Sequence, residues 1–225
     1  MAAIKSRFVA IGIALLACAA IPCVADETPV QVLRRVVVTE DVLPNAGIVS
    51  ETHLMRLHLA VMSETGWESY AIIEAAKRAA GILAQCAIRT SIELFEFNGP
   101  VRYRSLFTPV SRDLAKRLAL PTPTIFFIAD TLERPAFDAE AIGRGNSRTR
   151  PEMADTVWIA SGARDLPIVI AHELVHVLTD SGTHSDQPGN LMRDETAQDN
   201  ARLAPKQCDA IVTTASANGL LQPLR

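Results

Sequence analysis

The sequence predicts a mixed α/β fold in which a twisted mixed sheet is backed by two long helices. Short apolar segments with the character of strands recur along most of the 225 residues. Two long segments between them have apolar residues at helical spacing. No repeat, low-complexity tract or linker divides the chain. Strands and helices in this order bury their apolar faces best against one shared sheet, so a single domain is expected.

Five strands are expected from apolar runs or from alternating apolar and polar residues. The alternating segment 88–97 ends at Asn98-Gly99-Pro100, which favours a turn, and TIFFIA at 124–129 is typical of a buried strand. The expected strands span residues 36–38, 57–62, 88–97, 124–129 and 155–161. Residues 130–152 show no regular pattern, and within them 143–148 resembles an exposed loop.

Four helices are expected. The segment 64–85 places Trp67, Ile73 and Leu83 at helical spacing. Asp165 is suited to cap a later helix, with Pro167 tolerated in its first turn. The expected helices span residues 64–85, 110–118, the stretch between Asp165 and Asp180, and 205–218.

The N-terminus has the pattern of a secretory signal peptide over residues 1–25. Lys5 and Arg7 precede an apolar run that is too short for a comfortable membrane span, and small residues precede a cleavage site after Ala25. We therefore expect a secreted or periplasmic domain of residues 26–225 with no stable membrane span. Lipid anchoring at Cys18, in a loose lipobox, is a minority alternative.

Charge and cysteine content narrow the function further. Without Lys5 and Arg7, 20 basic residues face 25 acidic ones, a net charge of −5, and no basic stripe is present. Nucleic-acid binding is therefore not expected.

Cleavage leaves Cys86 and Cys208, which in an exported protein predict a disulfide, with two buried thiols as the alternative. The sequence does not indicate the oligomeric state.

The stretch His172-Glu173-Leu174-Val175-His176 carries the strongest chemical signal. On a helix, residues four apart share one face, so His172 and His176 can bind one metal ion. Glu173 can flank the same ion as a general base. This arrangement predicts one catalytic Zn²⁺ that activates a water molecule.

A third ligand is needed, because catalytic zinc has three protein ligands and one open position. Asp180-Ser181-Gly182 reads as the helix end, since glycine permits a left-handed turn. His184 follows at once and is the favoured third ligand. Asp180 and Asp186 are weaker candidates.

The segment 184–192, HSDQPGNLM, adds a second motif after HELVH, and the two together resemble a known family. Together with HELVH it resembles the zinc-binding motif of metzincin metallopeptidases, nearest the matrixins. In that family the third His is followed by Ser, a Pro-Gly element and a Leu-Met turn under the metal. The spacing from His184 to Met192 is the one that matrixins use.

The resemblance implies a zincin-like fold, with a small C-terminal subdomain of about residues 185–225 that ends in a helix. It implies that His172, His176 and His184 are zinc ligands and that Glu173 is the general base. It casts Met192 as the turn methionine packed beneath the ligands.

Three features depart from the family pattern. Thr179 stands where the metzincin glycine belongs, and the third His comes two residues late. The proline that often follows the turn methionine is replaced by Arg193 and Asp194. Gly182 is the expected substitute for the missing helix-ending glycine.

The function expected is that of an exported zinc endopeptidase acting on peptides or proteins. The substrate would lie extended along an edge strand near residues 133–143. Two alternatives stay open. A gluzincin-type peptidase would take Glu195, in an E-x-x-x-D pattern with Asp199, as third ligand. A catalytically inactive zincin-fold protein would serve as a binding module of the cell envelope.

Overall fold

The computed structural model describes residues 29–38, 50–131, 141–144 and 151–224. The predicted signal segment 1–25, with Cys18, lies outside these residues. Within the described ranges, no helix is long and apolar enough to cross a membrane.

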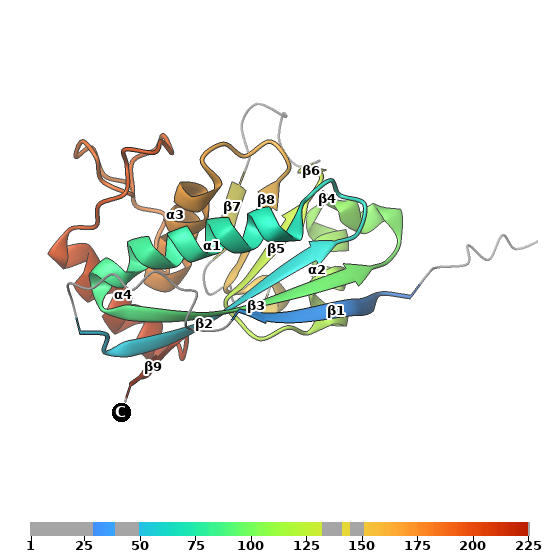
Figure 1. Ribbon diagram of the computed structural model, residues 1–225, viewed down its shortest axis with the longest axis horizontal. Coiled ribbons are helices and arrows are strands. Elements are labelled where there is room, and N and C mark those ends of the chain that lie inside the picture. The colour runs from blue at the N-terminus through green and yellow to red at the C-terminus, as the bar shows by residue number, and fades with distance from the viewer. Residues whose placement is uncertain (1–28, 39–49, 132–140, 145–150, 225) are drawn as a thin grey trace, which may run out of the picture.

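The architecture is a mixed α+β fold built on one twisted sheet (Figure 1). Its strands are β1 (Gln31–Val38), β2 (His53–Met62), β3 (Ile88–Asn98), β5 (Thr124–Ile128), β7 (Ala141–Arg144), β8 (Thr156–Ala160) and β9 (Leu221–Pro223). The order across the sheet is β1-β3-β2-β5-β8-β7, and β9 pairs with the start of β2. Strands β2, β3, β5 and β8 run parallel, while β1, β7 and β9 are antiparallel to their neighbours. A separate small pair joins β4 (Ser105–Leu106) to β6 (Asp130–Thr131).

Helices cover both faces of the sheet (Figure 1). They are α1 (Ser69–Leu83), α2 (Thr108–Leu118), α3 (Leu166–Thr179) and α4 (Pro205–Ala217). One apolar core joins the sheet to α1, α3 and α4, and a second joins the opposite face to α2. In β2, Leu57 and Leu59 point into the first core and Ala60 into the second, because successive strand side chains alternate. Strands β5 and β8 are buried on both faces, which explains their continuous apolar runs.

The predicted fold class is confirmed, and so are the expected strands and helices, with shifted ends. The predicted helix at 64–85 begins only at Ser69. Glu64 and Gly66 have positive φ values of 66° and 82°, so they form a turn before it. Residues 130–152 were expected to be irregular but contain β6 and β7. Gly143 and Arg144, assigned to an exposed loop, belong to β7, and residues 145–150 lie outside the described part.

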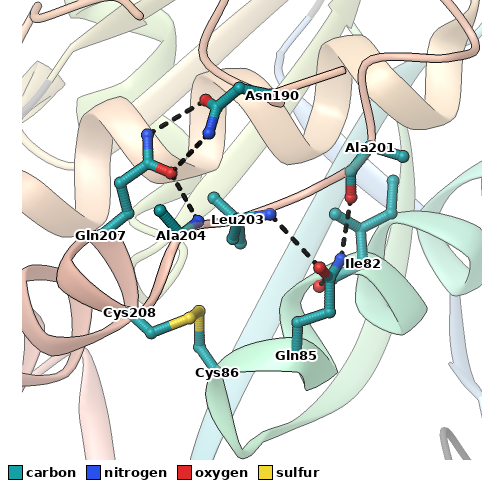
Figure 2. The surroundings of a disulfide bond; sticks show 9 residues. All are labelled: Ile82, Gln85, Cys86, Asn190, Ala201, Leu203, Ala204, Gln207 and Cys208. Atoms are coloured by element: carbon teal, nitrogen blue, oxygen red, sulfur yellow. Dashed lines mark hydrogen bonds between the residues drawn. A yellow bond between two sulfur atoms is a disulfide. The ribbon is translucent and has the colours of Figure 1, made fainter. Parts of the chain in front are cut away.

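The predicted disulfide joins Cys86, in a 3-10 turn (Ala84–Cys86) after α1, to Cys208 in α4. Figure 2 shows an amide side chain next to each half-cystine. Gln85 donates to the carbonyl of Ala201 at 2.8 Å and accepts from the Leu203 amide at 3.2 Å. The bond and this amide together fasten the chain before α4 to the end of α1.

Candidate metal centre

Helix α3 carries the HELVH sequence through the first core. Nine of its fourteen residues are buried, so its position is fixed by packing on several sides. The start of α3 differs from expectation. Asp165 adopts a left-handed conformation with φ 50°, and its side chain makes no capping hydrogen bond. Its backbone carbonyl instead accepts the amides of Ile168 and Val169, at 2.7 and 3.1 Å.

Three imidazole rings converge at the end of α3. The Nε2 atom of His176 lies 3.0 Å from Nε2 of His172 and 3.2 Å from Nε2 of His184. The third separation, between His184 and His172, is 3.3 Å. Zinc bound by nitrogens at about 2.0–2.1 Å in a tetrahedron places its ligand atoms about 3.3 Å apart. The three histidines therefore fit one metal ion.

Each ring has a partner at its other nitrogen. The Nδ1 atom of His172 lies 2.9 Å from the carbonyl oxygen of Leu191, and that of His176 lies 2.7 Å from the carbonyl of Ser181. The Nδ1 atom of His184 lies 2.8 Å from a carboxylate oxygen of Asp194. Because carbonyl and carboxylate oxygens only accept, we assign the proton of each ring to Nδ1. The Nε2 lone pairs then face one another and repel unless a cation lies between them.

Burial keeps the two helix histidines neutral. Loss of solvation lowers the pKa of His172 to about 4, although the Leu191 carbonyl acts in the opposite direction. Burial also lowers the pKa of His176. Near neutral pH both rings are therefore neutral, with a lone pair free on Nε2, and this is the form that binds metal.

Helix α3 ends at a different residue from the one expected. Asp180, and not Gly182, takes the left-handed conformation that ends the helix, with φ 49°. The amide of Ser181 then bonds the His176 carbonyl at 3.2 Å. Aspartate tolerates this conformation better than most residues, so no glycine is needed. His184 reaches the other two rings in spite of its late position.

A turn at 190–192 supports the site from below. Met192 is buried in the core that also contains Leu174 and Val175 of α3. The Met192 amide bonds the Asn190 side chain at 2.9 Å. That side chain forms a reciprocal amide pair with Gln207, at 2.8 and 3.1 Å (Figure 2).

The supporting residues Asn190, Gln207 and Asp194 were not identified from the sequence. Asn190 adjoins the Leu-Met pair, which is the one local signal that could have drawn attention to it. Gln207 and Asp194 stand among ordinary polar residues, and only folding brings them to the site.

The other acidic candidates are not members of the histidine cluster. In the described ranges, the side-chain cluster suited to a metal consists of His172, His176 and His184. Glu195, Asp180 and Asp186 are exposed and do not belong to it. Glu173 is half-buried on α3, between the two helix histidines.

The predicted substrate-binding strand near 133–143 overlaps β7. This strand pairs antiparallel with β8 and forms one edge of the sheet, beside α3. Residues 132–140 lie outside the described part. The described residues 141–144 form an edge strand next to α3, the helix that carries His172 and His176.

Comparison with known proteins supports the fold. No family model matches the chain, and no curated protein matches it. Among solved structures, metalloproteinase-II from Bacteroides fragilis is similar with a TM-score of 0.50 and 13% identity, over 72% of this chain and 52% of that one. A chaperone-substrate complex is similar with a TM-score of 0.50 and 12% identity, over 77% of this chain and 36% of that one. The protein thus spans about half the length of the first structure and about a third of the second. At these identities the likeness shows the fold alone.

Proposed function

We propose that the protein is a zinc-dependent endopeptidase with His172, His176 and His184 as metal ligands and Glu173 as general base. One observation carries the proposal. Three Nε2 atoms converge within 3.0–3.3 Å while every Nδ1 atom is engaged by an acceptor. The likeness in fold to a metalloproteinase agrees with it.

The donor set favours zinc over the common alkaline-earth ions. Calcium and magnesium prefer oxygen ligands, whereas three imidazoles at tetrahedral spacing suit zinc and leave a fourth position open. When bound in such a site, zinc activates a water molecule and polarises a carbonyl group. The cluster binds through neutral rings, so the metal keeps its full charge for that task.

Glu173 would act as the general base that accepts the proton of the attacking water. It adjoins His172 on a helix that the core holds in place, so its backbone position relative to the two helix histidines is fixed. As a carboxylate it can accept a proton from the attacking water and deliver it to the leaving amine. The substrate backbone would pair with β7, whose outer edge has no strand beyond it in the described sheet.

We propose that the protein is secreted or periplasmic. The disulfide between Cys86 and Cys208 suits an oxidising compartment, and the pattern of residues 1–25 is that of a signal peptide. Anchoring through Cys18 stays a minority alternative. An inactive envelope-binding protein is the second candidate function, favoured by the two extra residues before His184.

The test compares residues 26–225 of the wild type with Glu173→Gln. We expect one zinc per chain in both, cleavage of a peptide library by the wild type, and at least a hundredfold slower cleavage by the variant, since general-base catalysis contributes about 10²–10⁴-fold. Glu195→Gln is the matched control and should cleave like wild type. A wild type that binds zinc but cleaves nothing would favour the binding-protein alternative. Equal cleavage by Glu173→Gln and wild type would refute the proposed mechanism.

A further inference from the structure

The loop after α3 closes on itself through three contacts. The Ser185 amide bonds the Met192 carbonyl at 2.7 Å, and the Arg193 side chain bonds the Asp186 carbonyl at 3.2 Å. The third contact joins His184 to Asp194. Residues 184–186 and 192–194 thus lie side by side, which brings a carboxylate to the third histidine.

The three rings differ in what holds them. His172 is buried and His176 half-buried, and each donates to a neutral backbone carbonyl. The His184 side chain is 38% exposed, so packing constrains it less. It alone of the three has a charged partner, and that partner is the side chain of Asp194.

We infer that Asp194 is a positioning residue that fixes the tautomer and orientation of His184 as third metal ligand. The inference rests on the proposed metal site. Asp194 keeps the ring proton on Nδ1 and turns Nε2 toward the other two rings. A carboxylate on the far nitrogen also makes an imidazole a more basic ligand than a carbonyl does. The Asp194 carboxylate therefore restrains the orientation of the His184 ring, as burial restrains the rings of the two helix histidines.

The first measurement uses metal-free protein, so it does not depend on zinc. Nitrogen-15 NMR of the histidine side chains reports which ring nitrogen carries the proton, at a pH where imidazole is neutral. In wild type we expect the His184 proton on Nδ1. In Asp194→Ala the ring should shift toward the Nε2-protonated form that free imidazole side chains prefer. Asp194→Asn retains an acceptor oxygen and should restore most of the Nδ1 form.

The second measurement is zinc affinity by competition with a chelator. Loss of a hydrogen-bond partner of a metal ligand costs about 10–100-fold in affinity, and we expect this loss for Asp194→Ala with a smaller one for Asp194→Asn. Glu195→Gln is the control, because it neutralises the adjacent exposed carboxylate. It should match wild type in both measurements.

The outcomes separate the two proposals. An unchanged His184 tautomer in Asp194→Ala, or unchanged zinc affinity, would overturn the role of Asp194 even if wild type bound zinc tightly. An equal loss of affinity in Glu195→Gln would overturn it too, because general surface charge would then explain the effect. A wild type that binds no zinc would overturn the proposed function, whatever the tautomer result.

Discussion

The Nδ1 atom of His172 lies 2.9 Å from the backbone carbonyl oxygen of Leu191, nineteen residues further along the chain. This contact links the helix that supplies two of the rings to the turn beneath them. The same turn bonds the segment before α4, since the Leu191 amide donates to the Arg202 carbonyl at 2.8 Å. The orientation of the His172 ring therefore depends on a segment that is remote in sequence, and this dependence can be tested.

Replacing His184 by alanine should abolish tight zinc binding. It removes one of three converging Nε2 atoms, and the loss should exceed the 10–100-fold typical of changes to a ligand's hydrogen-bond partner. Zinc content and chelator competition measure the effect. Glu195→Ala serves as the control and should keep its zinc. Zinc loss in Glu195→Ala alone would instead support the gluzincin-type alternative.

Asn190→Ala should lower both stability and zinc affinity. The change leaves the Met192 amide and the Gln207 side chain without their buried partner, and such losses cost about 1–3 kcal/mol each. Urea unfolding measures the stability, and chelator competition measures the metal. Gln198→Ala, at an exposed amide, is the control and should change neither. Full zinc affinity in a destabilised Asn190→Ala would show that the turn does not hold His172 in place.

Removing the disulfide should destabilise the protein by about 2–5 kcal/mol, because the bond closes a long loop in the unfolded chain. Its half-cystines are 122 residues apart. Urea unfolding of the double variant Cys86→Ala, Cys208→Ala gives the value. Reductant should lower the stability of wild type and leave the variant unchanged. An effect of reductant on the variant would point to a cause other than this bond.

The metal-free protein should lose stability as the pH falls from about 6.5 toward 4. Burial lowers the pKa of His172 to about 4, below its ordinary value of 6.5. Between these pH values His172 binds a proton in the unfolded chain but stays neutral in the folded protein. Acid therefore favours unfolding. A shift of this size in one group corresponds to roughly 3 kcal/mol. Burial lowers the pKa values of His176 and His58 as well, which adds in the same direction.

Urea unfolding with a chelator present, repeated at several pH values, measures this dependence. His172→Gln should show a shallower decline, because the variant lacks the imidazole whose pKa burial lowers to about 4. A wild-type stability that stays level between pH 6.5 and 4 would contradict the expected burial of neutral rings.

Local pattern in the sequence predicted the elements and the two helix histidines. Alternation in 88–97 and the apolar run of 124–129 indicate strands because side-chain direction repeats every two residues. His172 and His176 share a face because the helix repeats about every 3.6 residues. The pattern after HELVH also indicated His184 and Met192, although their functional roles stay predictions.

Tertiary structure decided what depends on contacts between remote segments. The sequence favoured Asp165 as a side-chain cap and Gly182 as the turning residue, yet the backbone of Asp165 and the left-handed Asp180 take those places. Backbone conformation at a helix end depends on where the chain must go next, which local pattern does not contain. Likewise, Asp194 reaches the His184 ring only because the loop folds back, and Asn190 pairs with Gln207 only because α4 packs against the 190–192 turn. Their positions follow from hydrogen bonds across the fold, and these have no spacing rule that a single sequence reveals.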